Sequence, residues 1–535
     1  MDRETAQASS YDEVPYESYP YAQTHPDRLA TIARLFQMRP ASIDRCRVLE
    51  LGCAAGGNLI PMAVQLPDSH FVGIDLSARQ IADGRQVVAD LKLSNIELEH
   101  RSILDLDERL DLFDYILCHG VYSWVPDAVR EKILEVCASL LQPQGVAYVS
   151  YNTYPGWHMS GMIRDMLRYH ARRFARPQDA VAQSRALLNF LAEAVAEENS
   201  AYSILLKEGL EVFGKVSDSY LLHEYLEDVN EPLYFHEFVE RLGRHGLQYL
   251  AEAEVHAMMP ERLGNKIAAT LEKLSSEFIE LEQFLDFVRN RKFRQTLICH
   301  AGVALQRKVG AAVLQPLYMA SALRPVSPQP DLHSEAAETF CRTDGRTAST
   351  TEPVLKAALV HLAEHWPQAV PFAELTAAAC AALGPDKHAA APSEELLGKA
   401  LLQLYAANLV ELRTWRPPFT CRVPTRPQAS PLARLQAAIG VAVTNLRHER
   451  IALNTLERLV LRQLDGRHDR SALLDHLTEL AAHGTLEIKQ EGVLLESPET
   501  RRAVLSEQLD ACLAGLAKQA LLWSDDESTS LAVTA

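Results

Sequence analysis

Apolar positions follow two different periods in the N-terminal half of the chain, and this pattern predicts an α/β fold. Short apolar runs rich in strand formers end at polar or glycine-containing turns, whereas the segments between them repeat apolar residues every three or four positions. The predicted strands are Arg47–Leu51, His70–Ile74, a run that ends near Ser102, Phe113–Gly120 and Val146–Tyr151, and the helices between them include Leu59–Leu66 and Val129–Leu140. Because alternating strands and helices connect by right-handed crossovers, we expect a parallel, Rossmann-like sheet.

The chain continues with helical patterns that are longer than a crossover requires. Amphipathic segments at Met159–Phe174 and Asp179–Phe213 predict a helical insertion over residues 159–217. A helix at Phe235–Arg244 and strands at Gly246–Ala253 and Gln295–Cys299 then predict that residues 218–305 complete the sheet. We expect the insertion either to cover the cleft of the sheet or to form a homodimer interface.

The C-terminal part predicts smaller domains. The proline-rich stretch Arg324–Pro330 has the composition of a linker, which we place at residues 306–340. Three helical patterns and a hairpin follow, in an order typical of a winged helix: Glu352–His365, Phe372–Ala381 and Ser393–Asn408, then Leu409–Thr414 with Phe419–Val423. A similar order recurs nearer the end of the chain. We therefore expect winged-helix-like α+β domains at residues 341–428 and 429–535.

The segment Val48–Asn58, V-L-E-L-G-C-A-A-G-G-N, predicts a ligand site at residues 46–158. Its glycine-rich turn joins a strand to a helix, where the backbone can approach a ligand closely. Asp75 ends the next strand, where a carboxylate can accept hydrogen bonds from both hydroxyls of a ribose. A tight turn without a ligand is the alternative interpretation.

Glu50, which precedes the first glycine, decides between two cofactors. A dinucleotide site would need G-x-G-x-x-G and would hold a diphosphate, which the Glu50 carboxylate would repel. The same carboxylate can attract, directly or through water, the ammonium group of S-adenosylmethionine. The sequence therefore favours a methyltransferase over a dehydrogenase.

Candidate residues for methyl transfer follow the fourth and fifth predicted strands, in H-G-V-Y-S-W-V-P and Y-N-T-Y-P-G-W. An amine must lose a proton before it attacks a sulfonium methyl group, and a nearby imidazole or phenol assists this step. We expect catalytic roles for His119, Tyr122 and Tyr154, and substrate contacts for Trp124, Asn152 and Trp157. The alternatives are core packing for the aromatic residues and a plain turn for the second motif.

A tyrosine-rich segment, Tyr11–Pro26, precedes the first predicted strand. It repeats a Tyr-Pro spacing but has neither helical nor strand periodicity. Tyrosine ring faces attract cations such as a sulfonium, an interaction worth about 0.5–2 kcal/mol. We therefore expect residues 1–45 to form a lid, with Tyr16 and Tyr19 near the substrate; an adhesive tail is the alternative.

Composition narrows the classes of function. The chain has 535 residues, 47% of them hydrophobic, and a net charge of -17, which disfavours a protein that mainly binds nucleic acid. We expect the arginines between Arg413 and Arg470 to pair with acidic residues of the chain or of a protein partner; contact of a winged helix with nucleic acid is the alternative. The nine cysteines never form C-x-x-C, so neither a disulfide framework nor a metal site is predicted. Without an apolar leader or spanning segment, we expect a cytoplasmic protein with no membrane insertion.

The motifs quoted above, together with G-I-D-L-S and C-H-G-V-Y-S-W-V-P, resemble those of bacterial class I methyltransferases that carry a methyltransferase regulatory domain. The resemblance continues through H-E-Y-L-E-D-V-N-E-P-L-Y-F-H-E-F at residues 223–238 and covers nearly the whole chain. This family includes lysine methyltransferases that act on outer-membrane proteins. Ala54 departs from the family, because many class I enzymes have a second glycine there; the loop becomes bulkier without closing.

The resemblance implies an S-adenosylmethionine-dependent enzyme that methylates an amine, most directly a lysine of a protein substrate. A small-molecule acceptor, or a cofactor-binding scaffold without turnover, remains the alternative. The implied cofactor contacts are Glu50, Gly52, Cys53, Gly56, Asn58, Asp75, Leu76, Ser102, Ile103 and His119.

Overall fold

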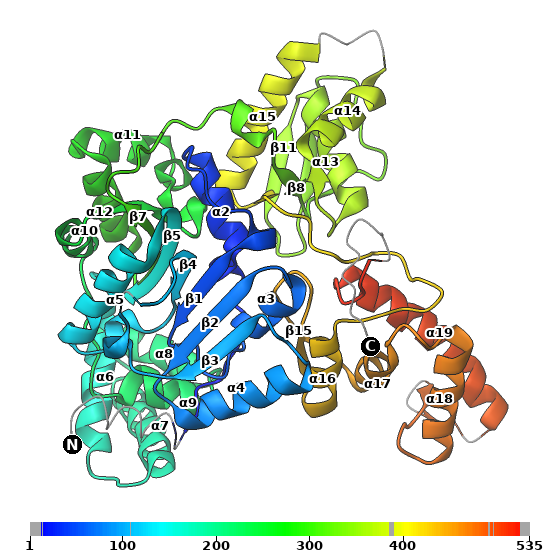
Figure 1. The fold of residues 1–535 in the computed structure, drawn as a ribbon, viewed down its shortest axis with the longest axis horizontal. Helices are drawn as coiled ribbons and strands as arrows, with labels where there is room; N and C mark the ends of the chain where they lie inside the picture. The colour runs from blue at the N-terminus through cyan, green and yellow to red at the C-terminus, as the bar shows by residue number, and fades with distance from the viewer. Residues whose placement is uncertain are drawn as a thin grey trace.

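A mixed sheet forms the centre of the protein. The computed structural model describes residues 12, 14–107, 109–384, 390–490, 493–495 and 497–524. The sheet has seven strands in these residues, in the order β3-β2-β1-β4-β5-β7-β6 (Figure 1). They are β1 (Arg47–Leu51), β2 (His70–Asp75), β3 (Ile96–His100), β4 (Phe113–Cys118), β5 (Leu141–Asn152), β6 (Leu247–Glu252) and β7 (Phe293–His300). Strands β1 to β5 are parallel, and β7 runs antiparallel to both of its neighbours, β5 and β6. This is the Rossmann-like methyltransferase fold that the sequence predicts.

Hydrophobic cores cover both faces of the sheet, which explains the continuous apolar runs of its central strands. Helices α3 (Leu59–Gln65), α4 (Ala78–Asp90) and α5 (Asp127–Leu140) are the crossovers between the parallel strands. Helix α2 (Pro26–Leu35) joins the core on one face, where Leu29 and Ile32 are fully buried with Val48. The prediction that all of residues 1–45 form a lid is therefore wrong for α2, whose apolar face is part of the core.

The helical insertion has a core of its own. Helices α6 (Trp157–Ala171), α7 (Pro177–Ala194) and α8 (Ala201–Phe213) pack around Leu167, Leu188 and Leu206. The chain then passes through α9 (Asp218–Leu221) and the helical turn Leu222–Leu226. It returns to the sheet with α10 (Phe235–Arg244), and α11 (Asn265–Leu274) and α12 (Phe278–Arg289) lie between β6 and β7. The homodimer interface that we expect from the insertion stays a prediction.

The middle domain differs from the sequence prediction in two places. Its helices are α13 (Pro353–His365), α14 (Phe372–Leu383) and α15 (Ala390–Ala406), and its strands are β8 (Tyr318–Ala320), β9 (Arg324–Pro325), β10 (Glu338–Cys341), β11 (Thr347–Thr350), β12 (Val370–Pro371) and β13 (Glu411–Arg413). Residues 306–340 are not a bare linker, because β8 to β10 begin within them and Leu317 and Met319 are buried in the core of this domain. Proline is tolerated in β9 because this strand lies at a sheet edge.

The predicted hairpin of Leu409–Thr414 with Phe419–Val423 is also wrong. Strand β13 pairs with β8 instead, and Phe419 forms an isolated bridge with Trp523 near the end of the chain. Pro417 and Pro418 separate the two predicted strands and lack the N–H donors that a hairpin ladder needs, which accounts for the difference.

The C-terminal domain contains α16 (Pro431–Ile439), α17 (Thr455–Gln463), α18 (Arg470–Ala482) and α19 (Pro498–Lys518), with a core that includes Val460, Leu477 and Leu509. Strands β16 (Lys489–Gln490) and β17 (Val493–Leu494) pair with each other as an antiparallel hairpin. A second hairpin, β14 (Ala442–Thr444) with β15 (Arg450–Ala452), was not predicted. Figure 1 shows β15 close to α3 of the methyltransferase domain.

Several arginines between Arg413 and Arg470 form ion pairs with acidic residues of the same chain. Arg447 contacts Glu411 and Glu449, Arg413 contacts Asp27 and Glu411, and Arg470 contacts Asp510. The nine cysteines are all free. In the described ranges, every helix is too short or too polar to cross a lipid bilayer.

A buried charge cluster joins the last two strands of the sheet to α12. Arg294 of β7 is fully buried and bonds Glu252 Oε1 at 2.6 Å, Asp286 Oδ2 at 2.8 Å and Glu282 Oε2 at 3.2 Å. Arg291 adds a second cation at 3.0 Å from Asp286. Burial raises the pKa of Glu282 to about 7, although Arg294 and Arg291 act in the opposite direction.

We predict that Arg294→Met lowers the free energy of unfolding by about 3–5 kcal/mol, because it leaves buried carboxylates without their central cation. Urea denaturation at pH 7.5, followed by tryptophan fluorescence, measures this loss. An unfolding midpoint equal to that of the wild type would contradict the assignment of Arg294 as the centre of the cluster.

Glu282→Gln is the matched control, with an expected change within about 1 kcal/mol, since a neutral side chain suits this position. The pKa of Glu282 lies near 7 in the folded state and at 4.5 ordinarily. Between pH 4.5 and about 7, Glu282 is therefore protonated more in the folded than in the unfolded protein. The free energy of unfolding of the wild type thus falls as the pH rises through this range. We expect Glu282→Gln to weaken this loss.

Candidate functional site

The turn between β1 and α3 has backbone angles that favour glycine. Gly52 has φ +76° and Gly56 has φ +72°, a region that side chains rarely adopt. A Cβ at Gly52 would also lie 2.4 Å from Val121 Cγ2. Ala54, the departure from the family pattern, adopts φ +50°, and its N–H donates to Asp75 Oδ2 at 2.9 Å. The turn is thus held open by the carboxylate of the neighbouring strand.

A cavity of about 680 Å³ opens at the carboxyl ends of β1, β2 and β4, next to this turn. Because the strands are parallel and β1 lies between β2 and β4, their last residues meet at one edge. Most of the residues that the sequence singles out line this cavity: Glu50, Gly52, Cys53, Asn58, Asp75, Leu76, Ile103 and His119 on the cofactor side, and Tyr16, Tyr19, Trp124, Asn152 and Trp157 among the substrate candidates.

Four predicted site residues do not line the cavity. Tyr122 is fully buried in the core, where its ring meets Phe238 edge-on at 5.4 Å. Tyr154 stacks on His158, with their ring centroids 4.0 Å apart. Gly56 serves the turn, and Ser102 accepts a hydrogen bond from the Leu104 N–H at the start of a short helical turn. Tyr122 and Tyr154 therefore do not face the cavity as catalytic groups would. Gly56 is required for the conformation of the turn.

The cofactor side of the cavity is built around two carboxylates. Asp75 accepts the N–H groups of Ala54 and Ser77, and burial raises its pKa. Glu50 is 3% exposed, and its Oε1 accepts a hydrogen bond from Asn58 Nδ2 at 2.8 Å. Burial raises the pKa of Glu50 to about 7; Asn58 lowers it and Asp75 raises it.

These carboxylates fit the two polar ends of S-adenosylmethionine. Glu50 Oε2 is buried and has no hydrogen-bond partner in the described structure, so it can accept a hydrogen bond from a bound ligand. The ammonium group of the cofactor can supply it. Asp75 lines the same cavity and keeps acceptor capacity for the ribose hydroxyls. When bound, the cofactor provides an electrophilic methyl group on a sulfonium; the chain provides its orientation.

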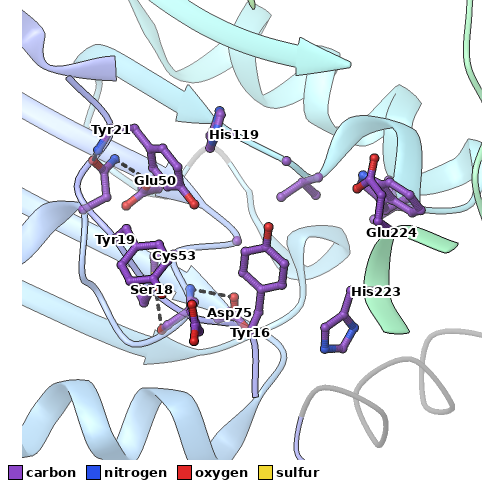
Figure 2. Close-up of a pocket in the computed structure, with 18 of the residues that line it drawn as sticks. Tyr16, Ser18, Tyr19, Tyr21, Glu50, Cys53, Asp75, His119, His223 and Glu224 are labelled. Atoms are coloured by element: carbon purple, nitrogen blue, oxygen red, sulfur yellow. Dashed lines mark hydrogen bonds between the residues drawn. The ribbon is translucent and has the colours of Figure 1, made fainter. Parts of the chain in front are cut away.

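The N-terminal segment lies along the cavity as predicted for Tyr16 and Tyr19, while Tyr11 lies outside the described residues (Figure 2). Its backbone approaches the turn closely, since the Gly57 N–H donates to Ser18 Oγ at 2.7 Å and a Cβ at Gly57 would lie 2.4 Å from Ser18 O. We call residues 14–24 the lid segment. Tyr21, also in this segment, lines the cavity as well; the sequence does not single it out, although its Tyr-Pro context is a signal for it.

His119 is held in a neutral form beside the lid segment. Its Nδ1 lies 3.0 Å from Tyr148 Oη and 3.2 Å from Ser150 Oγ, and its ring centroid is 4.0 Å from that of Tyr21. Burial lowers the pKa of His119 to about 4. A neutral imidazole of such low basicity is suited to hydrogen bonding and to forming a wall of the cavity, and is a weak proton acceptor.

A second acidic position, which sequence reasoning missed, lies across the cavity. Glu224 of the turn Leu222–Leu226 lines the cavity together with Tyr16, Tyr220 and Tyr225. In the view of Figure 2, Tyr16 stands between Asp75 and Glu224. Burial raises the pKa of Glu224 to about 7, and Arg164 lowers it. Glu224 belongs to the motif H-E-Y-L-E-D, but nothing local in this motif indicates a cavity.

One possible metal-binding group occurs in the described part of the chain, away from this cavity. His361, Glu364 and His365 of α13 place their ligand atoms within 4.8 Å of one another. None of the three lines the cavity. The group is a short-range consequence of i, i+3 and i+4 spacing on one helix.

Three family models match successive parts of the chain. A methyltransferase domain matches residues 43–209, a predicted methyltransferase regulatory domain matches residues 217–300, and the PKMT C-terminal winged helix domain matches residues 425–521. The matches follow the order of the core with its insertion, the strands β6 and β7, and the C-terminal domain.

Related proteins match the same parts of the chain. An uncharacterized protein of Rickettsia prowazekii is 38% identical over 97% of this chain and 94% of that protein. A second protein of the same organism is 44% identical over 43% of this chain and 93% of its own length. Among solved structures, PKMT2 from Rickettsia typhi in complex with AdoHcy has a TM-score of 0.86 and 32% identity, and the match covers 95% of this chain and 100% of that one.

The geometry and the comparisons therefore agree on the cofactor and on the reaction class. The cavity has a carboxylate for a ribose and an unpaired carboxylate oxygen for an ammonium group, and the PKMT2 neighbour was solved with AdoHcy. The chain belongs to the family of S-adenosylmethionine-dependent class I methyltransferases that combine a methyltransferase regulatory domain with a PKMT C-terminal winged helix domain.

Proposed function

We propose that this methyltransferase transfers the methyl group to the side-chain amine of a lysine in a protein substrate. The observation that carries the proposal is Glu224, a partly buried carboxylate among tyrosine rings in the same cavity as the cofactor-binding carboxylates. A carboxylate with aromatic walls suits an ammonium group on an alkyl chain, by charge and by cation–π attraction. The resemblance to lysine methyltransferases points the same way.

Glu224 can serve this substrate in two steps. Its carboxylate first holds the lysine ammonium and then accepts one proton from it, which leaves a neutral amine and a carboxylic acid. A pKa near 7 suits such a transfer at neutral pH. The amine nitrogen then forms a bond to the methyl carbon while the carbon–sulfur bond breaks, and the sulfur keeps the electron pair. Trp124 and Trp157 line the same cavity and can guide the alkyl chain.

Asp75→Ala tests the cofactor half of the site. We expect the Kd for S-adenosylhomocysteine to rise about 10- to 100-fold, or about 1.4–2.8 kcal/mol, because the ribose loses a charged acceptor. Isothermal titration calorimetry measures the change. Tyr154→Phe is the control and should bind like the wild type, since Tyr154 does not line the cavity. Equal affinity in Asp75→Ala and in the wild type would overturn the ribose assignment.

Glu224→Gln tests the acceptor half. We expect kcat/KM for a protein acceptor to fall about 100-fold, the usual scale for losing a positioned base, while the Kd for S-adenosylhomocysteine changes less than about twofold. The wild-type rate should rise with pH through about 7 as Glu224 ionises, and the variant should lack this rise. Labelled cofactor, a lysate of the source cell and amino-acid analysis for methylated lysine provide the measurement.

Glu211→Gln, an exposed carboxylate of α8 outside the cavity, is the matched control and should retain wild-type turnover. Label that enters only small molecules would refute the protein acceptor and favour the small-molecule alternative. Unchanged turnover and pH profile in Glu224→Gln would refute the role of Glu224 even if methylated lysine is found.

A further inference from the structure

The C-terminal domain contacts the floor of the cofactor site through one hairpin. Strands β14 and β15 meet at the turn 445–449, and the Nε2 of His448 in this turn lies 2.8 Å from Asn58 Oδ1. His448 is 1% exposed and Asn58 is 3% exposed, so water does not compete for this bond. The two residues are 390 positions apart in the chain.

Asn58 is the junction of the cofactor site. It is the residue before α3, but its side chain does not cap that helix. Its Nδ2 donates to Glu50 Oε1 at 2.8 Å, and its Oδ1 accepts the Tyr21 N–H at 3.0 Å. Because a backbone N–H can only donate, this contact fixes the orientation of the amide. One side chain therefore links the cofactor carboxylate, the lid segment and the C-terminal domain.

The geometry of His448 is imposed by its surroundings. His448 has a backbone φ of +62°, in the left-handed region that is unfavourable for residues other than glycine. Such a conformation persists only where the surrounding structure enforces it. Asn445 Oδ1 accepts the N–H groups of Arg447 and Glu449 at 2.9 Å each, which closes the turn around it. Burial lowers the pKa of His448 to about 3, so the ring is neutral and its single proton lies on Nε2, facing the Asn58 acceptor.

The residues on either side of His448 hold other parts of the molecule. The guanidinium of Arg447 bonds Glu411 Oε1 at 2.8 Å and covers the Trp366 ring at 4.6 Å, both in the middle domain. The guanidinium of Arg450 lies 4.0 Å from the ring centroid of Tyr19 in the lid segment. The hairpin is thus anchored on the middle domain and reaches the cofactor site at two points.

We propose that His448 is a positioning residue for the cofactor, through which docking of the C-terminal domain sets the affinity of the methyltransferase domain for S-adenosylmethionine. His448 does not line the cavity; it acts by holding Asn58, which orients Glu50 and the lid segment. By linkage, a cofactor that binds this arrangement must also stabilise the docked hairpin. The proposal requires no particular methyl acceptor.

The test compares two replacements of His448 in the full-length protein. His448→Phe keeps the volume of the ring but removes the donor, and His448→Gln restores an N–H at a similar reach. We expect the Kd for S-adenosylhomocysteine to rise about tenfold in the phenylalanine variant and to return within about threefold of the wild type in the glutamine variant. In turnover assays, KM for the cofactor should rise while kcat at saturation changes less than about twofold.

His468→Phe is the matched control. It changes a histidine of the same domain that pairs with Asp465 near the surface, and it should bind the cofactor with wild-type affinity. Wild-type Kd values in His448→Phe would overturn the proposal. So would equally weak binding in the phenylalanine and glutamine variants, which would indicate a packing role alone.

Hydrogen exchange gives a test that does not depend on the folding of a variant. In the wild-type protein, addition of S-adenosylhomocysteine should slow amide exchange in residues 441–453 at least about threefold, and exchange in α18 should not change. Unchanged exchange in 441–453 at saturating cofactor would overturn the proposal, including the case in which His448→Phe does not fold.

Discussion

Two carboxylates buried at the carboxyl edge of a parallel sheet require hydrogen-bond donors, and the architecture of the site follows from how each obtains them. Asp75 uses the backbone N–H groups of Ala54 and Ser77, which fixes the turn after β1 in its open form. Glu50 uses a side chain, Asn58, which is itself held by the lid segment and by His448. Donors from four separate parts of the chain thus serve one edge of the sheet.

The charge of the cavity bears on the order of chemical events. Glu50, Asp75 and Glu224 all line it and are acidic, which favours both the sulfonium of the cofactor and the ammonium group of the amine acceptor that we propose. Two cations in one cavity repel each other, so occupancy by the cofactor favours the neutral form of the amine. A carboxylate with a raised pKa can then take the proton. His119, whose pKa is lowered, contributes shape and hydrogen bonding without adding positive charge.

The sequence predicts those parts of the site that depend on local signals. A strand, a glycine-rich turn and an acidic residue at the next strand end lie within about thirty positions, so Glu50, Gly52 and Asp75 are found by spacing alone. Tyr122 shows the limit of this reasoning, since an aromatic residue in a turn after a strand can face the core or the cleft and only packing decides. Glu224 and His448 depend on contacts with distant segments, and no pattern around them records those contacts.

The middle domain shows a related limit. A proline-rich stretch has the same composition whether it joins two domains or forms an edge strand, so residues 306–340 were misassigned. What distinguishes the cases is burial of Leu317 and Met319 against helices that follow later in the chain. The predicted hairpin is the opposite error, in which a regular element is expected but does not form. The apolar residues on either side of positions 417 and 418 favour a hairpin, but the two consecutive prolines prevent it.

The separation of 390 positions between Asn58 and His448 has a consequence for synthesis of the protein. During translation, the sheet, the glycine-rich turn and the lid segment leave the ribosome long before the hairpin of β14 and β15. A nascent chain can therefore fold its methyltransferase core while the floor of the cofactor site still lacks the contact from His448. The complete site exists only after the hairpin of β14 and β15 has been translated and has docked, so assembly of the cofactor site depends on translation of the C-terminal domain.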